Sequence, residues 1–323
     1  MRLCALSGLL LIAMTTPAAV RIEKTEYKGW NNCFRVTNGE VELIVTADVG
    51  PRVIRFGFTG GQNLFKEFDE QMGRSGESEW RIRGGHRFWI APEVAPEISP
   101  VTYAVDNFPV DIEARDGVLI ATAPLEQKAG LRKQVEIRLA PSGTRVEVIH
   151  RVTNHNVWTV ELAPWVLTVM AQSGVGVFGL PPRGTHPEVL APTNPLIIWA
   201  FTDLSDPRWI FTKKYIALRQ DPANSVPMKI GSFHTENWGA YLLNGEAFIK
   251  RAKGQAGKPY PDLGASYETF TNGDMLELET LGPLEMLAPG ATAEHTEHWS
   301  LHKGVTVRDW TDAELDRVIL PLL

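Results

Sequence analysis

The segment Met275-Leu276-Glu277-Leu278-Glu279-Thr280-Leu281-Gly282-Pro283 alternates its side chains with a period of two, which is typical of a β-strand. Leu276, Leu278 and Thr280 then share one face, and Glu277 and Glu279 share the other. Two carboxylates therefore stand side by side, about 6.5 to 7 Å apart at Cα. If water is excluded, one of them has a raised pKa and can act as an acid or base near neutral pH. A strand with a solvated charged face fits the same pattern.

The rest of the chain also favours strands. Turn signals recur every 8 to 12 residues or so, which is the spacing of an all-β protein. Thr311 caps the single predicted helix, with Glu314 three residues later as in a capping box. Strands without an intervening linker predict one large β-sandwich domain over residues 20–323. The predicted strands cover 33–37, 41–46, 52–59, 109–114, 118–123, 131–140, 144–154, 215–218, 226–233, 238–243, 246–251, 267–271, 275–281 and 293–301, and 161–175 is a further extended apolar pair.

Composition limits the classes of function. The 323 residues are 44% hydrophobic and 22% charged, as in globular proteins with a sizeable core. A net charge of -6 argues against a nucleic-acid or anionic-membrane surface. The ten tryptophans offer flat faces on which sugar rings can stack, although any single tryptophan is more often core material.

The N-terminus has the pattern of an export signal. Met1 and Arg2 precede an apolar run at 3–14, and small residues follow at 16–18. This predicts a signal peptide over 1–19 that is too short for a permanent membrane anchor. The mature protein is therefore expected in the periplasm or outside the cell, without a membrane partner.

A second polar cluster surrounds Gly84-Gly85 in the segment 77–97, ESEWRIRGGHRFWIAPEVAPE. Glycines let the backbone approach a ligand, Arg and Trp supply donors and stacking faces, and His transfers protons near neutral pH. A turn with a solvated basic edge is the alternative. The candidate ligand-binding residues here are Arg83, His86, Trp89 and Glu93.

The remaining motifs are less specific. His234 and Trp238 lie close together in the sequence and are further candidates for a ligand-facing pair, although a satisfied interior histidine fits as well. The sequence has no HExxH, CxxC, GxSxG or P-loop motif, so we expect no resident metal and no cofactor.

Several segments together resemble the galactose mutarotase-like, or aldose 1-epimerase-like, superfamily, in a secreted bacterial branch. The resemblance covers most of the mature chain, and its last segments are the most specific. It implies a β-supersandwich with a sugar pocket on the concave face of the larger sheet. The matching segments are Asn38-Gly39-Glu40-Val41-Glu42-Leu43, Asp48-Val49-Gly50, Asn63-Leu64-Phe65, Val152-Thr153-Asn154, Leu278-Glu279-Thr280, Leu287-Ala288-Pro289-Gly290 and Trp299.

The resemblance also implies roles for individual residues. Glu279 matches the family glutamate that takes the proton from the anomeric hydroxyl, and Arg83 and His86 would fill the roles that hold the sugar. The family's central histidine, which protonates the ring oxygen, falls at Trp165 in this chain. Loss of a proton donor costs about 10² to 10⁴ in rate unless His86, His155 or His234 replaces it in space.

Three hypotheses follow. The first is a carbohydrate-active isomerase acting at the anomeric carbon of a small sugar or oligosaccharide. In it, Glu279 is the base, Glu277 tunes its charge, His86 is the acid or an orienting group, and Arg83, Trp89, Glu93, His234 and Trp238 bind the sugar. The second is a carbohydrate-binding protein without catalysis, as Trp165 suggests. The third is a purely structural secreted domain.

Overall fold

The computed structural model describes residues 19–93 and 106–323. The predicted signal peptide lies almost wholly outside the described residues, and so does the end of the 77–97 segment. Among the described residues, no helix is long and apolar enough to cross a membrane.

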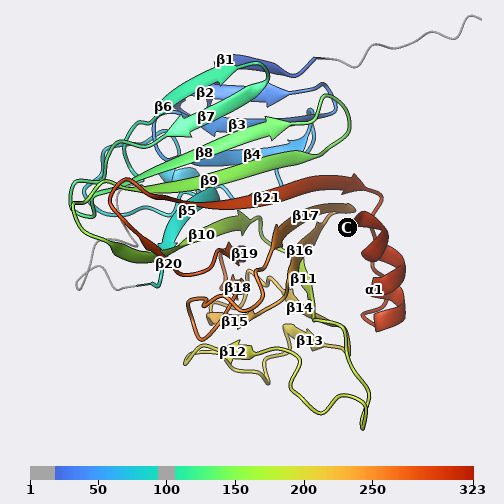
Figure 1. Ribbon diagram of the computed structural model, residues 1–323. Helices are drawn as coiled ribbons and strands as arrows, with labels where there is room; N and C mark the ends of the chain where they lie inside the picture. The colour runs from blue at the N-terminus through green and yellow to red at the C-terminus, as the bar shows by residue number, and fades with distance from the viewer. Residues whose placement is uncertain (1–18, 94–105) are drawn as a thin grey trace, which may run out of the picture.

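Two large antiparallel sheets form the molecule, as the sequence predicts (Figure 1). The first sheet has 11 strands and the second has 10 in the described part of the chain. In spatial order, the first contains β1 (Arg21–Tyr27), β2 (Trp30–Thr37), β3 (Val41–Thr46), β4 (Arg52–Phe58), β5 (Gly85–Ala91), β10 (Val160–Met170), β19 (Leu276–Leu281), β18 (Tyr267–Thr271), β15 (Met228–Ser232) and β12 (Leu196–Ile198), while β20 (Glu285–Leu287) pairs with β10.

The second sheet packs on the first. Its strands, again in spatial order, are β13 (Trp209–Phe211), β14 (Tyr215–Arg219), β11 (Val175–Gly179), β16 (Glu236–Leu243), β17 (Glu246–Lys253), β21 (Thr292–Lys303), β9 (Val146–Asn154), β8 (Leu131–Leu139), β7 (Val118–Thr122) and β6 (Asp111–Arg115). The shared core includes an aromatic group of Phe56, Phe65, Phe248 and Trp299, in which the rings of Phe65 and Phe248 are 5.3 Å apart.

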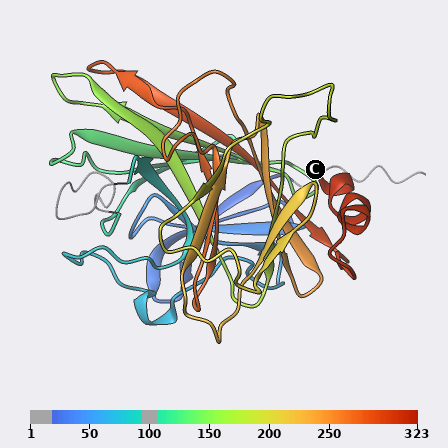
Figure 2. The ribbon, with the colours of Figure 1, turned by 90° about the horizontal axis from the view of Figure 1, so that it is seen from below.

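The predicted C-terminal helix is confirmed as α1 (Asp312–Val318), which lies at the periphery of the molecule (Figure 2). The Thr311 hydroxyl accepts a hydrogen bond from the Glu314 backbone N–H, as a capping residue should. Leu315 and Ile319 pack with Trp238 on the outer face of the second sheet. Short 3₁₀ turns, η1 (Asp69–Gln71) and η2 (Leu320–Leu322), complete the helical elements.

One prediction about elements is wrong. Residues 161–175 do not form one extended pair, because the chain turns after Met170, with Ser173 at φ 72°, and continues as β11 in the other sheet. The Gly84-Gly85 segment, with both glycines at positive φ, leads directly into β5. This connection decides where His86 points.

Candidate functional site

Charged residues line the outer face of the first sheet at its centre. Cross-strand pairing places Arg87 of β5 opposite Leu167 of β10, Leu167 opposite Glu279 of β19, and Glu279 opposite Glu268 of β18. Side chains opposite one another in neighbouring strands point to the same face. The alternate residues, such as Leu276 and Leu278, enter the core between the sheets. The face that carries Glu279 is therefore turned away from the second sheet.

Lys229 of β15 joins the two central carboxylates. Its Nζ lies 2.6 Å from Glu268 Oε2 and 2.9 Å from Glu279 Oε2. The same ammonium sits 4.6 Å from the ring centre of Trp165 and 4.7 Å from that of Trp199. Burial alone would lower the pKa of Lys229, but attraction to Glu268 and Glu279 raises it, so the ammonium stays charged.

Arg87 forms the second ion pair of this face. Its Nη2 lies 2.9 Å from Glu277 Oε1, and its guanidinium carbon lies 4.4 Å from the ring centre of Trp89 and 5.4 Å from that of Trp80. The indole N–H of Trp165 donates to Glu279 Oε2 over 2.8 Å. Each ion pair of this face is therefore packed against tryptophan rings.

The charged groups of this face are almost completely removed from solvent. Glu268 and Glu279 have no exposed surface, while Arg87, Lys229 and Glu277 are 3–5% exposed. Burial raises the pKa of Glu268 well above its ordinary value, against the pull of Lys229. Burial also raises the pKa of Glu277, against the pull of Arg87. These are the conditions in which a carboxyl group keeps a proton at neutral pH.

Several polar atoms of this face have no hydrogen-bond partner among the residues that the structure describes. They are Glu279 Oε1 and the Nε and Nη1 of Arg87. Glu268 lies within hydrogen-bonding reach of the Asp262 side chain. Buried polar atoms are normally paired, so an orphaned acceptor and orphaned donors on one face of the sheet indicate a place for a ligand or water. A hydroxyl group can both donate to a carboxylate and accept from a guanidinium.

The structure brings part of the predicted site together here. Glu277, Glu279 and Trp89 lie on this face. Glu93 is exposed and lies near Asp262. Burial raises the pKa of Asp262, and the charge of Glu93 raises it slightly further. Glu93 therefore lies at the edge of the face rather than at its centre.

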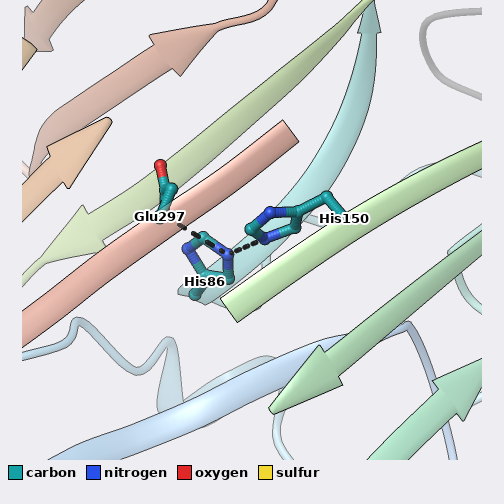
Figure 3. A group of neighbouring side chains, drawn as sticks. All are labelled: His86, His150 and Glu297. Carbon is teal, nitrogen blue, oxygen red and sulfur yellow. Dashed lines mark hydrogen bonds and ion pairs between the residues drawn. The ribbon is translucent and has the colours of Figure 1, made fainter. Parts of the chain in front are cut away.

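His86 does not join Glu279. It precedes Arg87 in β5, so it points to the opposite face, into the core between the sheets (Figure 3). Its Nδ1 contacts Thr168 Oγ1 over 2.9 Å and its Nε2 contacts His150 Nε2 over 2.8 Å. The expected meeting of His86 with Glu279 across one hollow is therefore not found, because alternation along β5 separates them.

Arg83 also lies elsewhere. Its side chain is fully buried, and its guanidinium pairs with Glu77 and Asn107, so it fixes the segment before β5. His234 and Trp238 line a separate cavity of about 210 Å³ that includes Arg251 and the C-terminal Leu323. Trp238 packs against Tyr215, at 6.0 Å between rings, beside α1. The predicted site residues Arg83, His234 and Trp238 are therefore not part of the face that holds Glu279.

A wider groove of about 1050 Å³ runs along the turn at 140–144 and the C-terminus. Its arginines already have partners, since Arg138 pairs with Glu136 and Glu147, and Arg251 donates to the Leu323 carbonyl. The groove lacks the buried, unpaired polar atoms that mark the Glu279 face.

The group around His86 is the one place in the described residues where a metal could be considered. His86, His150 and Glu297 offer three ligand atoms within 4.8 Å of one another (Figure 3). However, the Lys250 ammonium lies 2.9 Å from Glu297 Oε1 and balances its charge. A dication beside this buried ammonium would be uncompensated, so the group fits a charge-balanced hydrogen-bond network better than a metal site.

The hydrogen bonds of this network agree with that assignment. Lys250 donates to Thr168 Oγ1, which can donate to His86 Nδ1, and His86 Nε2–H can donate to His150 Nε2. His150 Nδ1–H then reaches the His295 carbonyl. Burial lowers the pKa of His150 to about 3, so the neutral rings that this chain needs are the stable forms.

Sequence reasoning missed Lys229 and Glu268 and did not choose Arg87. A signal for the first two exists, because each is a lone charge inside a short predicted strand, at 226–233 and 267–271. A charge in the middle of an apolar strand needs a partner on the same face. The local sequence does not show which strands are neighbours in the sheet. It therefore could not identify the partners of Lys229 and Glu268.

Comparison with known proteins gives the fold a name. No protein-family model matches the sequence, and no curated protein matches it. Solved structures do match in shape. A galactose mutarotase-like protein from Lactobacillus casei has a TM-score of 0.52 and 10% identity over 84% of this chain and 100% of its own.

Two further solved structures have the same fold as this chain. A galactose mutarotase related enzyme from Lactobacillus acidophilus has a TM-score of 0.53 and 10% identity, and covers 84% of this chain and 98% of its own. A galactose mutarotase-like protein from Clostridium acetobutylicum has a TM-score of 0.52 and 8% identity, and covers 88% of this chain and 99% of its own. The chain therefore has the β-supersandwich fold of the galactose mutarotase-like superfamily.

Proposed function

We propose that the outer face around Glu279 binds a neutral aldose and interconverts its anomers, with Glu279 as the base. The observation that carries this proposal is the orphaned, fully buried Glu279 Oε1, on the same face of the sheet as the unpaired Nη1 of Arg87. A sugar bound on this face would donate a hydroxyl proton to the carboxylate and accept from the guanidinium. Trp89 and Trp165 offer flat surfaces to the ring.

The likeness to mutarotase-like structures supports a sugar as the ligand. Glu279 is also in the place that the family resemblance gives to the base. Because Glu279 has no exposed surface, a sugar reaches it only when half-buried side chains of this face move aside, such as Trp80 beside Arg87 and Trp199 beside Lys229. Binding should therefore change the tryptophan fluorescence.

The test combines binding with exchange. Calorimetry and fluorescence on a panel of neutral hexoses and pentoses identify a sugar that binds, and NMR exchange spectroscopy measures interconversion of its anomers. We expect exchange above the buffer rate, and a decrease of about 10² to 10⁴ in Glu279→Gln. Glu294→Gln, an exposed residue of β21 paired with Arg151, is the matched control and should exchange normally. Normal exchange in Glu279→Gln would remove Glu279 from its role.

A second function, sugar binding without catalysis, is favoured by one contact. The Trp165 indole donates to Glu279 Oε2 at the position where the family resemblance expects an acid, so it stabilises the carboxylate without supplying a proton to the ring oxygen. Binding by calorimetry together with exchange at the buffer rate would establish this alternative.

Export is part of the proposal. The N-terminal pattern supports cleavage near residue 19 and a periplasmic or extracellular mature protein. N-terminal sequencing of the protein from fractionated cells tests this, and an intact Met1 in the cytoplasmic fraction would contradict it.

A further inference from the structure

The outer face around Glu279 contains one more carboxylate than it can balance. Three buried carboxyl groups, Glu268, Glu277 and Glu279, face two buried cations, Lys229 and Arg87. An uncompensated buried charge is costly, and a carboxyl group in that position takes up a proton instead. Asp262, half-buried at the edge of the face, adds a further carboxyl group beside Glu268, so at least one of the buried carboxyl groups is protonated.

The contacts indicate which one carries the proton. Glu277 is paired with Arg87, and Glu279 Oε2 accepts from both Lys229 and the Trp165 indole. Glu268 contacts Lys229 and the half-buried carboxyl group of Asp262, and a hydrogen bond between two carboxyl groups requires a proton on one of them. Burial raises the pKa of Glu268 well above its ordinary value, which agrees with this assignment.

We propose that Glu268 is the proton donor of this site and takes the role left open by Trp165. The proposal rests on the function proposed above. Glu268 and Glu279 are directly paired across β18 and β19, so their Cβ atoms are about 4.5 to 5.5 Å apart on one face. Both carboxyl groups are fully buried, and Glu279 Oε1 has no partner among the described residues. A sugar ring over this pair presents its anomeric hydroxyl to one carboxyl and its ring oxygen to the other.

The proton transfers balance. Glu279 takes the proton of the anomeric hydroxyl as the C1–O1 double bond forms and the C1–O5 bond breaks. The electron pair of that bond goes to O5, which takes the proton of Glu268. After rotation about C1–C2, O5 attacks C1, Glu268 recovers its proton from O5, and Glu279 returns its proton to O1. No oxidant, reductant or metal takes part in this sequence.

Glu268→Gln is the sharpest variant, because glutamine is neutral and similar in shape to the protonated acid. We expect it to fold with a melting temperature close to that of the wild type and to bind the sugar with a Kd within threefold. Its kcat for anomer exchange should decrease by about 10² to 10⁴. Glu268→Asp should recover part of the rate, and Glu294→Gln should leave it unchanged.

Two further readouts separate a proton donor from a structural residue. The wild-type kcat should decrease at alkaline pH as Glu268 loses its proton, and this alkaline limb should be absent from the residual activity of Glu268→Gln. Infrared spectra of the wild type at pH 7 should show a carboxylic-acid C=O band that Glu268→Gln lacks. Absence of that band, or wild-type exchange in Glu268→Gln, would overturn the proton donor while leaving the proposed function in place. A wild-type protein that binds sugar but does not exchange anomers would overturn the isomerase itself, and the proton donor with it.

Discussion

Lys229 shows how one residue can hold a buried acidic face together. Its ammonium contacts two carboxylates and lies between two indole rings, with 5% of its surface exposed. The sequence reveals that residue 229 is a charge in a strand, but it does not reveal the partners. Glu268 and Glu279 come from strands that are paired only after the whole sheet has formed.

Replacement of Lys229 by Met should lower the free energy of unfolding at pH 8 by about 3–5 kcal/mol, because it leaves buried carboxylate charge without its cation. In the variant the buried acidic pair takes up a further proton more readily than the unfolded chain does, so the folded state gains protons as the pH falls. The deficit should therefore be smaller at pH 5 than at pH 8. Urea denaturation of both proteins at the two pH values measures this.

Lys253→Met is the matched control, since Lys253 pairs with Glu236 at an exposed site, where the loss should not exceed about 1 kcal/mol. Equal stability losses in the two variants would contradict the assignment of Lys229 as the cation that holds this face.

At the scale of the elements, alternation along a strand decides which residues can work together. The pattern at 275–281 correctly predicts β19 and places Glu277 and Glu279 on one face. The same rule applied to β5 separates His86 from Arg87. However, Gly84 and Gly85 are typical of a turn, so the sequence did not predict that a strand begins there. The prediction of a common hollow for His86 and Glu279 fails for that reason, and the histidine instead ties β5 to β9 through His150.

The buried histidines between β9 and β21 should make the protein sensitive to acid. Burial lowers the pKa of His150 to about 3 and that of His295 to about 4, against the opposing effect of Glu297. The unfolded chain, with a histidine pKa near 6.5, then binds more protons than the folded chain below that pH. The stability that these neutral histidines contribute should be complete above pH 6.5 and decrease as the pH falls toward 4.

His295→Gln should reduce this slope between pH 6 and 4.5 by up to about 1.4 kcal/mol per pH unit, which corresponds to one proton. Glutamine can still donate to Thr280 Oγ1, as His295 Nε2 does over 2.8 Å. His298→Gln, an exposed residue of the same strand, is the control and should keep the wild-type slope. Urea denaturation across this pH range gives the slopes, and an unchanged slope in His295→Gln would refute the assignment.

For the molecule as a whole, the order of the elements was largely predictable and the assembly of the site was not. Turn spacing and the family resemblance led to the two-sheet fold, because these signals are local or extend along the chain. The site combines Arg87, Lys229, Glu268 and Glu279, whose positions span most of the sequence. Their proximity depends on the order β5-β10-β19-β18-β15, which no local pattern contains.

The charge of the assembled face should also select among sugars. With Glu268 protonated, Glu277 and Glu279 balance Arg87 and Lys229, so no cation is left for an anionic ligand. A sugar carboxylate about 4 Å from either glutamate would be repelled by roughly 4 kcal/mol at an effective dielectric constant of 20. We therefore expect a hexuronate to bind at least tenfold more weakly than its parent hexose, a difference that calorimetry measures directly.

Adding 0.5 M salt should reduce this difference in affinity only slightly, because buried charges are poorly screened. A hexuronate that binds as tightly as the hexose would show that Arg87 or Lys229 is released to the ligand, and the neutral balance of the face would then be wrong.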